Sequence, residues 1–146
     1  MASAMPNVAK GLFLTGNITG LSDTFKIVLM NTSFVFDPDT HSTYADVIAN
    51  EVANGLGYTA GGQALSGVAL TVVNSGNYAM LSWSQAEWTA AGGSILASGA
   101  IIFDDSTTLV TDGYADAVIS YIDFGETKTT TDGKILRIQN INVTFS

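Results

Sequence analysis

The sequence predicts a mainly β protein: a single-domain antiparallel β-sandwich of jelly-roll-like type with one or two short helices. Its 146 residues suit one domain with a core of its own. Short apolar runs recur between turn signals about every eight to twelve residues, which is typical of sandwiches and jelly-rolls. No internal repeat, low-complexity tract or linker divides the chain. We expect residues 1–15 to form an N-terminal arm or short helix and residues 16–146 to form the sandwich.

The segment after Pro6 predicts one or two helical turns over residues 7–15. Pro6 stands at a suitable helix start, and Gly16-Asn17 is a good stop. The apolar residues 12–14 are crowded together and form no clean amphipathic stripe, so a strand remains the alternative.

A strand is predicted over residues 25–30. Apart from Lys26, apolar side chains occupy both of its faces, so we expect it to be central or covered on both sides. Residues 31–33 separate it from a short apolar run at 34–36, and Asp37-Pro38-Asp39 then marks a turn.

The best helix pattern covers residues 44–54. Thr43 or Ser42 can cap its start, and Asn54-Gly55 is expected to end it. An uncharged, glycine-rich connection follows at 55–62. The helical spacing is kept by four apolar residues: Tyr44, Val47, Ile48 and Val52.

The rest of the chain predicts strands. Residues 68–73 and 78–83 form the two arms of a hairpin around a four-residue turn. Further strands are expected at 97–103, ended by Asp104-Asp105, at 117–124, ended by Gly125, and at 134–145.

The last of these strands changes phase. Leu136 and Ile138 share one face, whereas Ile141 and Val143 have the opposite parity. A one-residue shift reverses the buried face of a strand, so a bulge or bend is expected near Gln139-Asn140. Such a bend lets a strand turn a corner in a sandwich.

The charge balance excludes several classes of function. Thirteen acids against five bases give a net charge of −8, and the bases form no run, which argues against binding nucleic acid or an anionic membrane. Charged residues make up only 12%, about half the usual fraction, so we expect neighbouring molecules to cover part of a neutral surface. The chain lacks cysteine, which excludes disulfides and thiolate chemistry. It also lacks a secretory signal and a membrane-spanning apolar run, so we expect a soluble protein made in a cytoplasm.

Asp37, Asp39 and His41 are the candidate metal ligands, because they alone group acids with the only histidine. Alternate positions in an extended segment can aim three side chains to one side, as a ligand set requires. The alternative is a turn anchored by Pro38 whose Asp side chains accept hydrogen bonds from local backbone amides. We favour the turn, since no further ligand motif is present, and predict no metal.

No other pattern indicates catalysis or a cofactor. Asp104 and Asp105 are adjacent and point to opposite faces of a strand, so we expect solvated acids that end it. A Ser-His-Asp site would have to use His41, and no Gly-x-Ser-x-Gly motif accompanies it. The glycine doublets lack the Lys-Ser/Thr of a phosphate-binding loop. The prediction is that the chain is not an enzyme.

Two tryptophans leave a sugar-binding platform open as an interpretation, because aromatic faces stack on sugar rings. Trp83 shares strand parity with Leu81, which favours a core position. Trp88, together with nearby tyrosines such as Tyr78, is the candidate for the platform.

Several blocks of the sequence resemble a family of small structural virion proteins of tailed bacteriophages. The resemblance runs along most of the chain, and residues 108–115 fit it less well and are expected to form an exposed loop. Its motifs are structural and bring no catalytic residues. The blocks that carry it are 8–18, 23–30, 40–47, 51–62, 88–95, 100–105 and 119–125.

The resemblance implies a capsid decoration or cement protein on the capsid surface of the virion, made in the cytoplasm of a bacterial host. Its partners would be the major capsid protein and sister subunits, with a trimer favoured. A neck, tail or head-fibre-base component is the alternative, and a carbohydrate-binding module is a third. For the cement role we expect residues 1–15 and one sheet edge to make the contacts. The interface candidates are Val8, Lys10, Leu12, Phe13 and Leu14.

Overall fold

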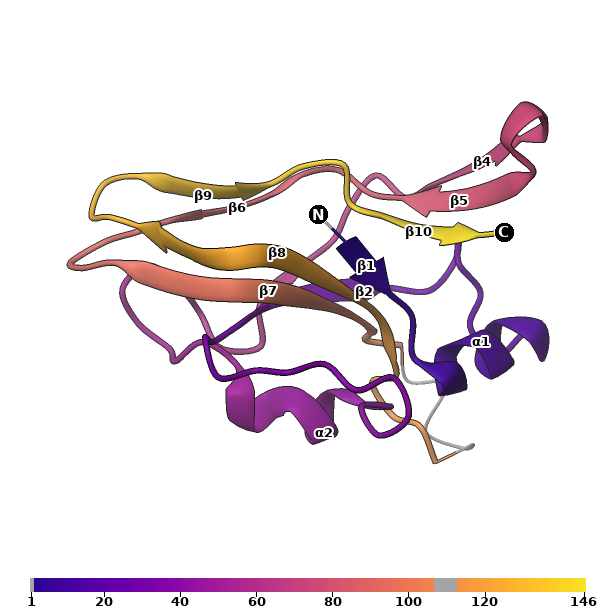
Figure 1. Ribbon diagram of the computed structural model, residues 1–146, viewed down its shortest axis with the longest axis horizontal. Helices are drawn as coiled ribbons and strands as arrows, with labels where there is room; N and C mark the ends of the chain where they lie inside the picture. Colours follow the sequence, from indigo (N-terminus) through magenta and orange to yellow (C-terminus); the bar gives the residue numbers. More distant parts are fainter. Residues whose placement is uncertain (1, 107–112) are drawn as a thin grey trace.

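The computed structural model describes residues 2–106 and 113–146, so most of the loop expected at 108–115 lies outside the described residues. The described chain forms two layers of antiparallel strands with short helices around them (Figure 1). One layer is a five-stranded sheet, and the other consists of a three-stranded and a two-stranded sheet. The chain is mainly β and sandwich-like, as the sequence predicts.

The five-stranded sheet has the strand order β1–β8–β7–β2–β3. Every neighbouring pair is antiparallel. β1 lies at one edge, where it pairs with residues 121–123 of β8 and so attaches the N-terminal segment to the sheet. The five strands are β1 (Ala2–Ala4), β2 (Phe25–Met30), β3 (Gln63–Ala64), β7 (Ile95–Asp104) and β8 (Val118–Thr130).

The second layer contains the predicted hairpin and the divided C-terminal strand. The three-stranded sheet has the order β10–β5–β4, and the two-stranded sheet pairs β6 with β9. A short 3-10 turn, η2 (Asn74–Gly76), connects β4 to β5 at the place predicted for the hairpin turn. The strands are β4 (Ala69–Val73), β5 (Tyr78–Ser82), β6 (Ala86–Thr89), β9 (Ile135–Ile138) and β10 (Asn142–Phe145).

The predicted corner in the last strand is confirmed. β9 ends at Ile138 and β10 begins at Asn142, each in a different sheet of the second layer. Between them Asn140 has a left-handed backbone with φ of 55°. Ile138 and Val143 are both buried despite their opposite parity, because the chain turns between them.

Helix α1 (Asn7–Leu14) realises the helical alternative for the N-terminal segment. It ends in a Schellman motif: Gly16 has φ of 76°, and the amide of Asn17 donates to the carbonyl of Leu12 over 2.9 Å. Ala9 and Leu12 are buried, so α1 packs on the domain as part of it.

The helix expected over residues 44–54 is shorter, and this prediction is wrong at its C-terminal end. α2 (Tyr44–Val47) is followed only by a 3-10 turn, η1 (Ile48–Asn50). Thr43 does cap it, in a capping box with Asp46. The helix stops because residues 51 and 52 pair with β2. Glu51 forms an antiparallel β-bridge with Met30, and the amide of Val52 donates to the carbonyl of Leu29. Their backbone groups are therefore not available to continue the helix.

β8 does not stop at Gly125, which corrects another predicted boundary. It continues to Thr130, and its pairing with β7 shifts register between Ala97 and Gly99. Gly125 takes a positive φ of 73° inside this irregular stretch. A glycine within a strand pattern can mark a bulge as well as an end, and here it marks the bulge.

Both faces of the central strand β2 are covered, as predicted. Ile27 and Leu29 belong to the core between the two layers. Val28 and Met30 belong to a second cluster, in which Phe34 and α2 cover the opposite face.

Candidate functional site

The structure divides the N-terminal interface candidates into buried and accessible residues. Leu12 lies in the core, where it attaches α1 to the domain. Val8 and Phe13 pack partly against the same core, and the Phe13 ring meets Phe145 edge-on with centroids 4.9 Å apart. Lys10 is exposed, and Leu14 at the end of α1 is 89% exposed.

The candidate metal ligands form the turn that the sequence analysis favours. Asp37 Oδ1 accepts from the amide of Asp39 over 2.9 Å, and this bond is the main reason that the pKa of Asp37 is lowered. His41 Nδ1 accepts from the amide of Asp37 over 3.1 Å, and its ring stacks on Phe34 at 5.2 Å. Asn7 donates to Asp39 over 2.5 Å. In the part of the chain that the structure describes, no group of three acidic or histidine side chains is placed to hold a metal ion.

Asp104 is fully buried, so the expectation of a solvated acid at this strand end holds only for Asp105. Burial raises the pKa of Asp104 to about 6, and the nearby Asp23 carboxyl adds to the rise. Asp104 Oδ1 accepts from the amide of Ser106 over 2.7 Å, whereas Oδ2 has no hydrogen-bond partner among the described residues. Asp105 forms a half-exposed ion pair with Lys26 at 3.1 Å.

Glu51 is the centre of a polar cluster that the sequence did not indicate. It accepts from the hydroxyl groups of Tyr44 and Tyr58, the latter over 2.6 Å, and from the amide of Gly61 over 2.7 Å. The Tyr58 hydroxyl in turn accepts from the amide of Leu29 over 3.1 Å. Burial and Glu51 raise the pKa of both tyrosines, so these groups stay protonated donors. The cluster fastens the connection 55–62 to β2.

The sugar-platform interpretation loses its central residue. Trp88 and Trp83 are both buried in the core between the layers. Trp88 lies against Tyr58, with ring centroids 6.1 Å apart, and Trp83 meets Phe25 edge-on. Neither indole face is available to stack on a sugar.

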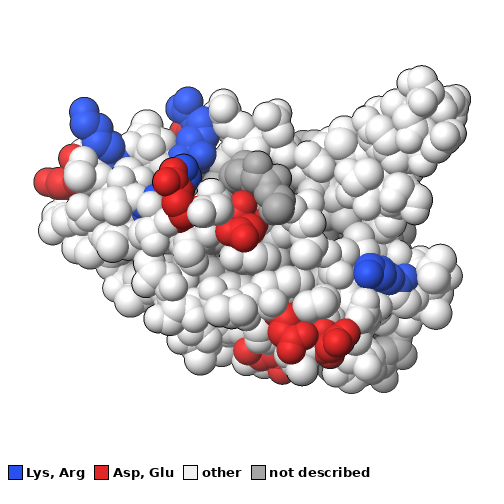
Figure 2. Space-filling view, in the orientation of Figure 1, with Lys and Arg blue, Asp and Glu red and all other residues white. Residues whose placement is uncertain are grey.

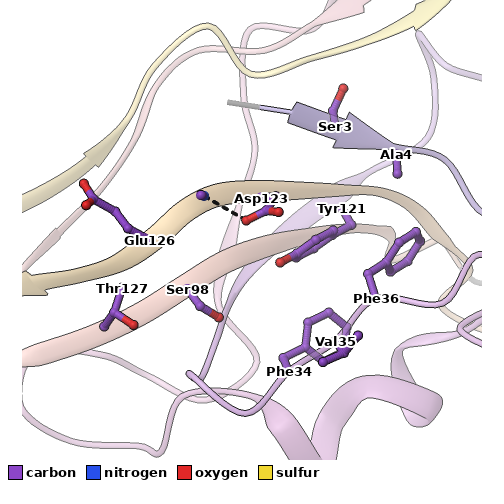
Figure 3. A pocket seen from close by; sticks show the side chains of 11 residues that line it. Ser3, Ala4, Phe34, Val35, Phe36, Ser98, Tyr121, Asp123, Glu126 and Thr127 are labelled. Carbon is purple, nitrogen blue, oxygen red and sulfur yellow. Dashed lines mark hydrogen bonds between the residues drawn. The ribbon is translucent and has the colours of Figure 1, made fainter.

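An aromatic groove of about 560 Å³ opens beside β1 and β8 (Figure 3). Tyr121 stacks on Phe36 at 5.0 Å and meets Phe34 edge-on at 5.4 Å. Gly99 makes room for the Tyr121 ring, because a Cβ there would lie 2.6 Å from it. We name it the aromatic groove; its lining residues are Ser3, Ala4, Phe34, Val35, Phe36, Ser98, Tyr121, Asp123, Gly125, Glu126 and Thr127.

The aromatic groove can bind an apolar group by packing, but its lining residues form no catalytic arrangement. They include two carboxylates and no Lys, Arg or His. Asp123 accepts from the amide of Gly125 over 2.8 Å, and Glu126 is paired with Lys128 at 2.5 Å. From the sequence, only the apolar run 34–36 was visible as a feature of this groove. Tyr121 lies beside that run because of the register of distant strands, which local sequence patterns do not indicate.

A second candidate surface is the β4–β5 hairpin, which projects from the body of the molecule (Figure 1). Leu70 is 54% exposed and Val72 is 64% exposed, and the residues between and before them are exposed as well. No Asp, Glu, Lys, Arg or His occurs between Glu51 and Glu87 in the sequence. Figure 2 accordingly shows the projecting hairpin without charged atoms.

α1 and the hairpin lie at the same end of the molecule, which we call the hairpin end. The contact between Phe13 and Phe145 joins α1 to β10, and β10 belongs to the same sheet as β4. The ion pairs described for Lys26, Lys128 and Arg137 belong to other strands. The hairpin end therefore combines exposed apolar groups with little charge.

None of the helices in the described part of the chain combines the length and apolar character that crossing a membrane requires. Comparison with protein-family models, with curated proteins and with solved structures finds no match to this chain.

Proposed function

We propose that this chain is a structural virion protein of a tailed bacteriophage, a capsid decoration or cement protein that binds the major capsid protein as one of several copies. It acts by adhering to the capsid surface, and its bound copies stabilise the assembled shell by mass action. The single observation that carries the proposal is the hairpin end, where Leu14, Leu70 and Val72 are exposed beside a long stretch without charge.

Leu14, Leu70 and Val72 are exposed at the same end of the molecule, and this grouping favours an interaction role. Scattered apolar residues are ordinary on a protein surface, whereas grouped ones mark contacts with other molecules. The low charged fraction of 12% points the same way, since charge is what keeps soluble proteins apart. The sequence resemblance to virion structural proteins supplies the kind of assembly.

Within the hairpin end, we assign the capsid contact to the exposed side of α1. Leu14 is more exposed than any other large apolar residue in the described chain, and Lys10 is exposed on the same helix. The neighbouring Leu12 and Phe13 fix this helix to the domain, so Leu14 is presented from a rigid support.

The test compares Leu14→Lys with Ile135→Lys, which changes a 50% exposed residue on β9 at a distance from α1. Lysine suits the C-terminal end of a helix, so Leu14→Lys should fold normally. We expect its occupancy on purified particles to fall about tenfold or more, which is the effect of losing one central contact. Ile135→Lys should be retained like the unaltered protein. Occupancy is measured by quantitative gel densitometry of purified particles.

Two results would count against the proposal in different ways. Particles that contain none of this chain would refute the virion role itself. Equal retention of Leu14→Lys and Ile135→Lys would refute the assignment of the capsid contact to α1.

A further inference from the structure

The outer edge of β4 is open. β4 ends the three-stranded sheet and pairs only with β5, from Ala69 opposite Ser82 to Val73 opposite Tyr78. Natural edge strands are usually protected by a charge, a proline, a bulge or very short length. β4 has five residues, none of them charged or proline, and its pairing with β5 is regular. The backbone groups on its outer edge are thus ready to receive another strand.

Most other edges of the described sheets carry protection that β4 lacks, and β10, the opposite edge of the same sheet, has four residues and contacts α1 through Phe145 and Phe13. β1 has three residues and β3 has two. In the β6–β9 sheet, Glu87 and Arg137 sit opposite each other and form an ion pair. β4 instead shows Leu70 and Val72 to solvent, both more than half exposed.

The uncharged, projecting hairpin is the place where a second copy of this chain can meet the first with least repulsion, and we take a second copy as the occupant of the β4 edge. Two copies carry a net charge of −8 each and repel one another over most of their surfaces. The hairpin is drawn from the stretch between Glu51 and Glu87, which contains no charged residue. It also projects from the body, so two hairpins can meet while the acidic parts of both copies stay apart (Figures 1 and 2).

We propose that two copies of this chain pair antiparallel through β4 and join their three-stranded sheets into one continuous sheet. An antiparallel pair of identical strands is related by a two-fold axis, so the same surface is used on both copies. A register centred on Thr71 places Leu70 of each copy opposite Val72 of the other, which buries these side chains. The contact yields a dimer in place of the trimer that the family resemblance implies.

This inference deepens the proposed function, on which it rests for the role of the pair: it assigns the sheet edge to a sister subunit and leaves α1 for the capsid. The dimer itself can be tested on the purified chain without any particle. Its failure and the failure of the virion role are therefore distinguishable.

The first experiment measures oligomeric state by sedimentation equilibrium across a range of concentration. We expect the unaltered chain to approach twice its monomer mass of 15.2 kDa at a concentration of about 100 µM. The affinity is modest because each copy contributes only one five-residue strand, which makes a small interface. Val72→Lys places a charge on the edge and should weaken the dimer at least tenfold. Val35→Lys, at an 80% exposed position away from the hairpin, is the matched control and should leave it unchanged.

The second experiment does not depend on how well a charged variant folds. The chain has no cysteine, so Thr71→Cys introduces the only thiol. Oxidation should give a covalent dimer, because the central residue of β4 faces its own copy across the two-fold axis. Thr129→Cys on the exposed part of β8 is the control and should form no covalent dimer.

Three results would overturn the inference: a monomer at every concentration, a trimer, or a dimer that Val72→Lys leaves intact. Cross-linking at Thr129 as efficient as at Thr71 would overturn it as well. A dimer that forms as expected from a chain absent from particles would leave the inference standing and refute the virion role.

Discussion

At the scale of single residues, Asp104 shows how a buried acid couples stability to pH. Its carboxyl group is shielded from solvent and lies near Asp23, and its pKa is raised to about 6. An aspartate in an unfolded chain titrates near 4, so the folded protein holds this proton more tightly. The free energy of unfolding should therefore fall as the pH rises from about 4 to about 6, and stay lower above that range.

Asp104→Asn should remove this pH dependence and raise stability at pH 7. The Asn oxygen can still accept from the amide of Ser106, and the amide nitrogen can donate to the Asp23 carboxyl. We expect a gain of about 1–2 kcal/mol at pH 7.5 and little change near pH 4, below which both the folded and the unfolded chain hold the proton; urea unfolding measures both. Asp105→Asn, which changes the partly exposed neighbour, should keep the slope of stability against pH. An Asp104→Asn protein less stable than the original at pH 7.5 would contradict this account.

At the scale of elements, the connection 55–62 shows how a glycine-rich segment becomes a fixed part of the fold. Glu51 binds Tyr58 and Gly61 from one side. Gly62 packs so closely on β2 that a Cβ would lie 2.0 Å from the carbonyl oxygen of Ile27. What composition alone describes as flexible is held by hydrogen bonds and close packing.

Adjacent glycines in this connection give a matched pair of variants. Gly61 and Gly62 both have positive φ, but a Cβ on Gly61 meets no atom within 4 Å. Gly61→Ala should therefore lose only about 1–2 kcal/mol from backbone strain. Gly62→Ala should lose about 1–3 kcal/mol more, because β2 has to move. Chemical denaturation measures both, and equal losses would show that the close approach to Ile27 is unimportant.

Elements that depend on local pattern were predictable from the sequence, and elements that depend on distant pairing were not. The β4–β5 hairpin and the corner at Asn140 follow from turn residues and parity. The helix over 44–54 was overextended because β2 binds the backbone at Glu51 and Val52, which lies beyond any local signal. The aromatic groove was missed for the same reason, since Tyr121 reaches Phe36 only through the register of the main sheet.

At the scale of the whole molecule, the separation of charge from apolar surface decides how copies meet. All of the net charge of −8 lies outside the β4–β5 hairpin, on the rest of the molecule, where a few weak ion pairs form at the surface. Repulsion between bodies opposes association over a distance of about 10 Å at 0.1 M salt. Association through the hairpin therefore works against this repulsion and gains nothing from ion pairs.

Added salt should strengthen the dimer. Raising sodium chloride from 50 mM to 500 mM screens the repulsion between two acidic bodies and leaves the apolar contact intact. We expect the dissociation constant to fall severalfold, measured by sedimentation equilibrium at both salt concentrations. A dimer that weakens with salt would point to ion pairs at the contact and thus to a surface other than β4.

The placement of β1 also limits how early the chain can complete its fold during synthesis. Ala2–Ala4 pair with residues 121–123, and Phe13 leans on Phe145. On a ribosome that adds about 5–20 residues per second, the first strand waits on the order of 6–25 s for its partner to emerge. Phe13 lacks its contact with Phe145 for at least that interval, so we expect the nascent chain to expose this apolar ring to aggregation until residues 121–145 have been made.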